Sequence, residues 1–334
     1  MKLFRDCAIR SIASAIVAVA ITLAFGVAPT TAAPIDVRYS LWAKPGEAQH
    51  TATLKFAEVL EKESNGKFKV TVYPGNQLGT PKEMLAQLAL NITQIEASGD
   101  PGLKEMEMLA LPYLMNDMAN YISIIASPIG ETWNKRLIKE RKVRLLGILP
   151  RSPRQISANK VINSVADLKG MKIRVPERDY YVQSFIAFGA KPTPMAFKEV
   201  YTSLQTGVVD GQENPIETIW AMKFHEVQKS VAIVDYIKKP AWVKISEPFW
   251  QTLSTQDREL FQRAQRASEV VVNELLGKQQ KELIAKMEAA GLVITHPDQE
   301  EFRRATQIVR DTLGKKTWGE ALYKQIVEIG KKKL

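Results

Sequence analysis

The chain has 334 residues, of which 45% are hydrophobic and 25% are charged, and its formal net charge is +10. This composition is ordinary for a globular protein, and the length is sufficient for two domains. Its single cysteine, Cys7, precedes an apolar run near the start of the chain, which excludes a disulfide framework and a thiolate metal site from the remainder.

The first thirty-odd residues have the order of a secretory signal peptide. Three basic residues come first, an uncharged apolar run follows over 12–27, and small residues follow over 28–33. The run is shorter than the ~20 residues that span a membrane, and an uncleaved anchor is the alternative interpretation. Cleavage after Ala33 would leave Pro34 as an unfavourable first residue, so we expect cleavage after Ala32 and export to the periplasm.

Loss of this segment, with its three bases and one acid, leaves a net charge of +8. An excess of positive charge favours anionic partners. The bases are dispersed among many acids, and an exported protein rarely meets nucleic acid. We therefore expect an anionic small molecule and no nucleic acid.

Patterns typical of strands and helices alternate along the remaining chain, which predicts an α/β fold. Strands are predicted at 37–42, 68–72, 143–149, 171–175 and 292–295, and helices at 49–63, from Thr80, at 197–205, at 255–290 and beyond 300. Thr80, Pro81 and Glu83 predict a capping box. Gly277 is a candidate bend in the longest helix. Two domains, if present, must be joined by crossing strands or helices, because no flexible linker divides the chain.

The search for catalytic chemistry finds little. His50, His225 and His296 are scattered without metal-ligand spacing. The sequence has no nucleophile elbow, no Walker loop and no dinucleotide-binding glycine motif. Carboxylates are plentiful, but nothing singles out an acid/base pair. We therefore expect a protein that is not an enzyme and that has no cofactor and no metal ligands.

Two arginines stand beside predicted strands. Arg154 follows the strand at 143–149, and Arg174 lies within the short strand that ends at Pro176. A guanidinium matches a carboxylate with two parallel hydrogen bonds, which favours a carboxylate-binding site. A structural ion pair or a solvated sheet edge is the alternative for both. Asn214 is either a ligand contact or an ordinary turn residue.

Residues 170–176 and 189–215 closely resemble the solute-binding subunits of tripartite ATP-independent periplasmic (TRAP) transporters, the DctP-like family. Weaker similarity covers nearly the whole chain after the signal peptide, including 73–79 and 110–113. The resemblance implies a periplasmic-binding-protein-like (type II) α/β fold of two lobes with a ligand cleft and a hinge. It implies the membrane subunits of a sodium-driven transporter as partners. We expect 34–151 with 240–279 in one lobe, 152–239 with 280–334 in the other, and 1–32 as the signal peptide.

The resemblance also implies roles for individual residues. Arg174 matches the family arginine that pairs with the ligand carboxylate, and Arg154 matches a second arginine twenty residues earlier. Asn214 matches the family asparagine of a Gly-Gln-Glu-Asn segment, and Phe197 matches an apolar contact.

Other positions depart from the family pattern. Sialic-acid-binding members carry polar residues where this chain has Trp42 and Pro81, which argues against sialic acid. Trp42 either shapes a smaller, more apolar pocket or is a core or hinge tryptophan. Residues 96–102 are expected to form a loop beside the pocket.

The sequence leaves the ligand open. A C4-dicarboxylate, a sugar acid, a 2-oxo acid and an aromatic carboxylate all fit one arginine clamp. Two alternatives to a transport subunit remain: a periplasmic sensor component for the same kind of acid, and an exported organic-acid lyase.

Overall fold

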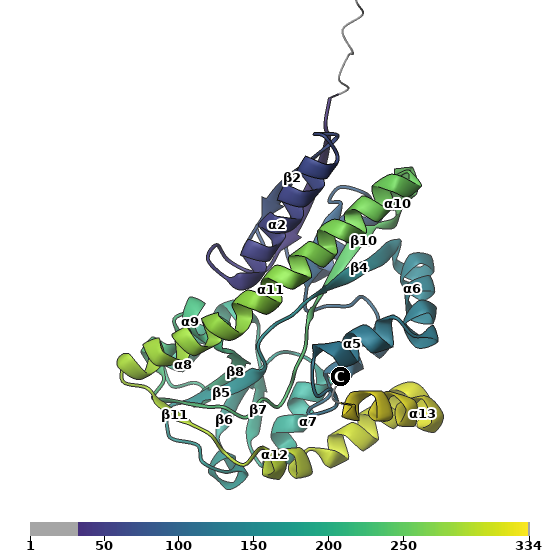
Figure 1. The fold of residues 1–334 in the computed structure, drawn as a ribbon. Helices are drawn as coiled ribbons and strands as arrows, with labels where there is room; N and C mark the ends of the chain where they lie inside the picture. The colour runs from purple at the N-terminus through teal and green to yellow at the C-terminus, as the bar shows by residue number, and fades with distance from the viewer. Residues whose placement is uncertain (1–32, 333–334) are drawn as a thin grey trace, which may run out of the picture. The chain divides into compact units, whose positions relative to one another are not determined.

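Two β-sheets form the framework of the molecule (Figure 1). The computed structural model describes residues 33–332, and the residues from Asp36 onward form one compact unit. The predicted signal peptide lies outside the described residues. The first sheet has the order β2-β1-β3-β10-β4, with β1 (Ile35–Leu41), β2 (Phe68–Tyr73), β3 (Ile95–Ser98), β4 (Val143–Leu149) and β10 (Ala241–Ser246). The second has the order β11-β9-β5-β8-β6-β7, with β5 (Arg154–Ala158), β6 (Lys172–Val175), β7 (Lys191–Pro194), β8 (Gly211–Pro215), β9 (Ser230–Ala232) and β11 (Val293–Thr295).

Helices alternate with these strands, which confirms the predicted two-lobed α/β architecture. The α-helices are α2 (Ala48–Glu63), α3 (Pro81–Ala89), α4 (Lys104–Glu107), α5 (Met118–Ile125), α6 (Pro128–Arg141), α7 (Asp179–Ala187), α8 (Val200–Gln205), α9 (Ile216–Ala221), α10 (Glu247–Thr252), α11 (Thr255–Ala289), α12 (Gln299–Ala305) and α13 (Gln307–Lys331). Short 3₁₀ turns are η1 (Met108–Ala110), η2 (Val165–Leu168), η3 (Phe197–Glu199) and η4 (Phe224–Val227). Among the residues from 33 to 332, no helix combines the length and the apolar character needed to cross a bilayer.

Local sequence signals explain several of these elements. Thr80 and Glu83 form the predicted capping box of α3: the Glu83 amide donates to Thr80 Oγ1 at 3.4 Å, and the Thr80 amide donates to Glu83 Oε2 at 2.7 Å. Helix α11 runs continuously through Gly277. The helix predicted from residue 197 begins instead as the 3₁₀ turn η3, and α8 starts at Val200. Phe197 is 40% exposed, so it is not part of the buried stripe of α8.

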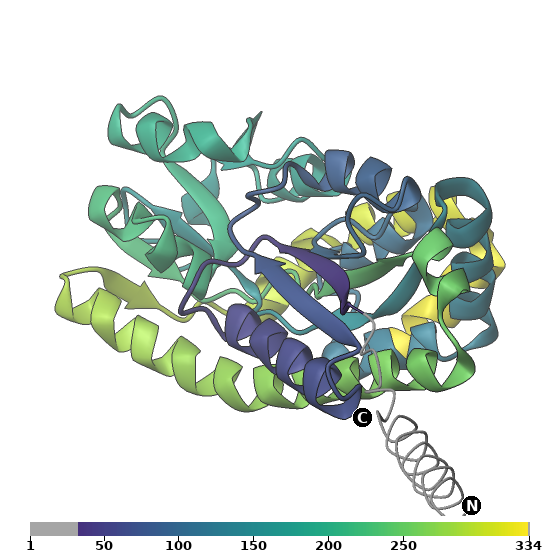
Figure 2. The same cartoon turned by 90° about the horizontal axis from the view of Figure 1, so that it is seen from above.

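The chain passes between the sheets three times in its described part. Residues 150–153 connect β4 to β5, residues 233–240 connect β9 to β10, and α11 leads from the first sheet toward β11. Helix α11 packs on α2 and β4 beside the first sheet and on α9 and β11 beside the second. In both views α2 and α11 lie side by side (Figures 1 and 2).

Strand direction places the ends of several strands together. β1 and β3 are parallel, so their carboxyl ends, at Leu41 and Ser98, meet at one edge of the first sheet. β6 and β8 are parallel in the second sheet, and β5 begins where the antiparallel β8 ends, with Arg154 opposite Pro215. Ligands of open α/β sheets bind beyond the carboxyl ends of the strands. These two edges are therefore the places to look for a site.

Candidate ligand-binding site

A cavity of about 490 Å³ lies at these strand ends and takes its walls from both sheets. Its volume falls within the range of roughly 300–1,000 Å³ that is typical of small-molecule sites. All five residues predicted from the sequence line it: Trp42, Arg154, Arg174, Phe197 and Asn214. The other lining residues are Lys44, Glu47, Gly75, Asn76, Pro81, Ser98, Gly99, Arg151, Pro176, Lys198, Thr218, Ala221 and Met222.

Arg174 is a buried cation on β6 with only neutral hydrogen-bond partners. Its side chain is 2% exposed, and its Nε and Nη2 donate to the Met195 carbonyl at 3.1 and 2.6 Å. In the described part of the chain, no carboxylate lies within the 4.0 Å of an ion pair. Burial lowers the pKa of Arg174 from its usual value. An anion that entered the cavity would therefore meet a guanidinium whose charge is uncompensated.

Arg154, by contrast, is already paired. Its Nε and Nη2 both donate to the carboxylate of Glu213, which is fully buried, and Nη2 also reaches Asn214 Oδ1 at 2.9 Å. Tyr236 donates to the same carboxylate at 2.6 Å. Burial is the largest single effect and lowers the pKa of Arg154, but the charge and hydrogen bonds of Glu213 together with Tyr181 and Tyr236 outweigh it, and the net pKa is raised well above the usual value. The structural ion pair considered from the sequence is present at this position, at the wall of the cavity.

Asn214 lies in β8 rather than in a turn, so the turn interpretation is wrong. Its Oδ1 accepts from Arg154, and its Nδ2 donates to Gln212 Oε1 at 2.6 Å. Gln212 donates in turn to Ser157 Oγ at 2.8 Å. This chain of hydrogen bonds holds the Asn214 amide at the cavity wall with one N–H still available.

Two of the aromatic rings that line the cavity each lie against an arginine. The Phe197 ring centroid lies 5.8 Å from the guanidinium carbon of Arg174, and the Trp42 centroid lies 4.9 Å from that of Arg151. These are cation–π distances. Trp42 directly follows β1 and is partly buried, and Pro81 stands at the start of α3, so both positions that depart from the sialic-acid pattern line the cavity.

The loop predicted at 96–102 is partly a strand. Residues Ile95–Ser98 form β3, and Glu96 is fully enclosed in an ion pair with Lys244 at 2.7 Å. The segment is a strand because β3 lies between β1 and β10 in the sheet and is hydrogen-bonded to both of them. Only Ser98 and Gly99 of this segment line the cavity.

Arg151 is the main lining residue that sequence reasoning missed. It lies in the 150–153 connection, where no periodicity marks a side chain as buried. The available signal was a second arginine three residues before Arg154, with a proline on either side of Arg151–Ser152.

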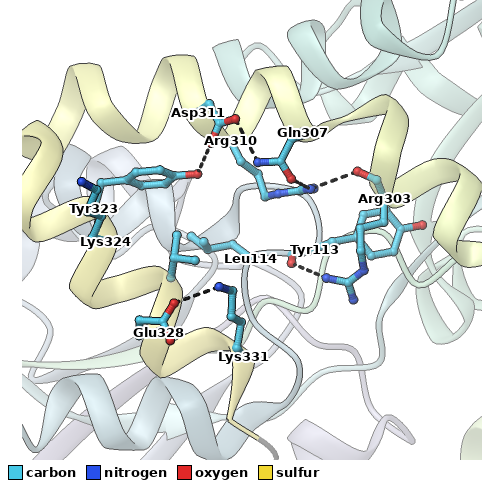
Figure 3. A pocket seen from close by; sticks show the side chains of 11 residues that line it. Tyr113, Leu114, Arg303, Gln307, Arg310, Asp311, Tyr323, Lys324, Glu328 and Lys331 are labelled. Atoms are coloured by element: carbon cyan, nitrogen blue, oxygen red, sulfur yellow. Dashed lines mark hydrogen bonds and ion pairs between the residues drawn. The ribbon is translucent and has the colours of Figure 1, made fainter.

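A second cavity, of about 410 Å³, lies among the C-terminal helices, and its polar groups are satisfied by one another (Figure 3). Arg310 donates to Gln307 Oε1 at 2.5 Å and to the Pro112 carbonyl at 3.0 Å. Tyr323 donates to Asp311 at 2.8 Å, and Lys331 donates to Glu328 at 2.8 Å. This cavity offers less to an anion than the one at Arg174. Among residues 33–332, no cluster of three or more His, Cys, Asp or Glu side chains is placed to hold a metal ion.

Comparison with known proteins gives a consistent family. Residues 39–316 match the model of bacterial extracellular solute-binding proteins, family 7 (DctP). The chain is 35% identical over 290 residues to the sialic acid-binding periplasmic protein SiaP of Vibrio cholerae, covering 85% of this chain and 90% of that protein.

Solved structures agree with this family. A TRAP periplasmic solute-binding protein from Roseobacter denitrificans with bound L-galactonate is 29% identical, with a TM-score of 0.77 over 88% of this chain and 98% of that one. One from Polaromonas bound to D-erythronate is 26% identical, with a TM-score of 0.79 over 90% and 99%.

Proposed function

Because the chain belongs to family 7 of the bacterial extracellular solute-binding proteins, the DctP family of TRAP solute-binding proteins, we propose that it captures a sugar-acid anion in the Arg174 cavity. The protein then delivers the bound anion to the membrane subunits of a TRAP transporter, which are the partners that the family implies. The single observation that carries the proposal is the buried, uncompensated guanidinium of Arg174 in a cavity of about 490 Å³. The sugar-acid class is supported by the L-galactonate and D-erythronate held in related structures.

In the proposed complex, Arg174 donates its remaining N–H groups to the ligand carboxylate. Phe197 packs against the carbon skeleton, as Trp42 does on the opposite wall. Arg154 acts mainly through Asn214, whose free amide N–H is directed to a ligand oxygen. Since the cavity takes its walls from both sheets, a bound ligand contacts both lobes and favours their closed arrangement.

The proposal also includes the signal peptide and the residue limits of the two lobes. Residues 1–32 are the proposed signal peptide, which is removed on export by cleavage near Ala32. The lobes comprise 34–151 with 240–279, and 152–239 with 280–334. The sheet membership of β10 with β1 to β4 and of β11 with β5 to β9 supports this division. Sialic acid is not the proposed ligand, because Trp42 and Pro81 offer no side-chain hydrogen-bond acceptor for its hydroxyl groups.

The test is calorimetric titration of the exported, ligand-free protein with a panel of sugar acids and other carboxylates. Arg174→Ala should weaken the best ligand on the order of 100-fold or more, because a buried carboxylate loses its charged partner. Arg174→Lys should restore part of the loss, since lysine keeps the charge but not the planar fork.

Arg304→Ala is the matched control, because that side chain is 70% exposed and lies outside the cavity. Unchanged affinity in Arg174→Ala would refute the assignment. Conversion of a bound acid into another compound would identify an exported lyase instead.

A further inference from the structure

A separate cavity of about 420 Å³ lies between the segment that follows β3 and the segment that precedes α7. Among residues 33–332, it shares no lining residue with the Arg174 cavity. The two cavities nevertheless adjoin twice along the chain, because Gly99 lines the first and Asp100 the second, and Pro176 lines the first and Glu177 the second. Its walls therefore come from both sheets, at a place that the ligand proposed for the Arg174 cavity does not reach.

Arg178 joins the two sides of this separate cavity. Its Nη1 lies 2.6 Å from Glu107 Oε1, and its Nη2 lies 3.5 Å from Asp100 Oδ2. The side chain of Arg178 is 40% exposed, whereas those of Asp100 and Glu107 are 21% and 12% exposed. Burial is the largest single effect and lowers the pKa of Arg178, but the neighbouring carboxylates and tyrosines outweigh it, and the net pKa is raised. The guanidinium is thus charged and is held by two partly shielded anions.

Asp100 is fixed to the first sheet. It stands two residues after β3, and its amide donates to Ser98 Oγ at 3.2 Å. Lys244 of β10 donates to its carbonyl oxygen, and the Gly102 amide donates to its Oδ1 at 2.8 Å. These contacts leave Oδ2 as the carboxylate oxygen that faces Arg178.

Arg178 is fixed to the second sheet in the same way. It stands three residues after β6 and directly before α7. Its amide donates to the Pro176 carbonyl at 2.8 Å, and its carbonyl accepts from the Val182 amide at 3.3 Å in the first turn of α7. Four residues separate it from Arg174. A movement of β6 relative to β3 must therefore change the distance between Arg178 and Asp100.

An ion pair that joins two moving parts acts differently from one within a single part. Arg136 also contacts two carboxylates, Glu105 at 2.6 Å and Glu140 at 2.8 Å, and all three lie in the first lobe as we assign it. Such a pair is present in the open and closed arrangements alike. The contact between Arg178 and Asp100 is made only when the lobes are together, so it favours the closed arrangement. The fraction of closed molecules in turn sets the apparent affinity for a ligand.

We propose that Arg178 is a positioning residue whose ion pairs with Asp100 and Glu107 clasp the closed lobes and so set the affinity for any acid held at Arg174, without contact with that acid. The inference rests on the proposed function, because a clasp of this kind acts in a protein that closes on its ligand. The short 174–178 segment couples the two events, since the ligand carboxylate fixes Arg174 at one end of it and the clasp fixes Arg178 at the other.

The first test is the affinity and dissociation rate of Arg178→Gln for several acids, L-galactonate and D-erythronate among them. Every acid that wild type binds should weaken by the same factor, about threefold to tenfold, because one partly screened set of charge pairs is lost from the closed form alone. The loss should lie mainly in faster dissociation, measured by stopped-flow fluorescence. Arg136→Gln is the matched control and should leave both quantities unchanged, since its side chain is 38% exposed and also contacts two carboxylates.

A charge exchange separates the clasp from a merely structural role. Arg178→Glu should weaken binding further than Arg178→Gln, because three carboxylates would then meet. The double variant Arg178→Glu, Glu107→Arg should recover part of that loss. A loss in Arg178→Gln that differs from acid to acid would identify Arg178 as a ligand contact and overturn the proposal. Unchanged affinity and dissociation rate for every acid would overturn it as well.

A measurement of distance tests the clasp independently of the ligand's identity. Spin labels at Leu54→Cys on α2 and Val208→Cys after α8 report on the two lobes, since these side chains are 47% and 54% exposed and the single native cysteine lies in the predicted signal peptide. Arg178→Gln should populate the shorter, closed distance less than wild type does, with and without added acid. Identical distance distributions would overturn the clasp. Failure of every acid to bind wild type would count against the sugar-acid function, and the distances would still decide the clasp.

Discussion

At the scale of single residues, the two arginines first found in the sequence occupy opposite electrostatic states. Arg154 is compensated by Glu213, which is 0% exposed and also accepts from Tyr236. Arg174 is nearly as buried but donates only to a carbonyl oxygen. Breaking a buried ion pair leaves one charge stranded, whereas removing an uncompensated cation leaves nothing stranded. Removing the guanidinium should therefore destabilise the protein strongly at Arg154 and only weakly at Arg174.

We predict that Arg154→Met lowers the unfolding free energy of the ligand-free protein by about 3–5 kcal/mol. Arg174→Met should change it by less than about 1.5 kcal/mol, roughly the net worth of the hydrogen bonds to Met195. Urea unfolding of the two variants measures both values. The double variant Arg154→Met, Glu213→Leu should recover part of the loss, since it removes both charges. Equal destabilisation by the two single variants would contradict the distinction between a paired and an unpaired arginine.

At the scale of elements, the local sequence pattern predicts a helix or strand correctly where the apolar residues keep a single helical or strand periodicity. The strand at Val143–Leu149 and the helix at Thr255–Ala289 lie within a residue of their predicted bounds, and the α3 capping box is present as predicted. The pairing of Arg154 with Glu213 was not predictable, because it depends on the antiparallel register of β5 with β8, residues 59 apart in sequence. Arg151 and Lys239 lie in connections without a period, so only the fold brings them to Gly99.

Helix α11 gives a prediction at this scale, since it packs beside both sheets. Gly277 lies within it with helical geometry, and a Cβ added there would meet no atom within 4 Å. Gly277→Ala should therefore stabilise the protein by about 0.5–1 kcal/mol, because alanine loses less backbone entropy on folding. Thermal unfolding measures the gain. Ligand affinity should be unchanged if α11 moves as a rigid rod during closure. A stabilised variant with weakened binding would show that α11 bends at Gly277 when the ligand binds.

At the scale of the whole molecule, side chains and helices tie together segments far apart in sequence. Arg178, which precedes α7, pairs with Glu107 at 2.6 Å and with Asp100 at 3.5 Å. Helix α13 is fixed to the 105–120 segment, because Trp318 Nε1 donates to the Glu105 carbonyl at 3.1 Å and Asn120 donates to the Ile329 carbonyl at 2.9 Å. The C-terminal helix thus links residues that the sequence assigned to different lobes. A relative movement of the lobes must either carry α13 along or be limited by it.

Lys239 lies near Asp100, Glu107 and Arg178, and its lowered pKa makes the stability of the fold depend on pH. Burial lowers its pKa to about 7, from an ordinary value near 10.5, while Glu107 and Asp100 oppose this fall and Arg178 and Arg154 add to it. Below pH 7 the folded protein must hold a buried ammonium, and between about 7 and 10 the unfolded chain binds one more proton than the folded one. The unfolding free energy should therefore rise with pH over that interval. Lys239→Met should remove this rise.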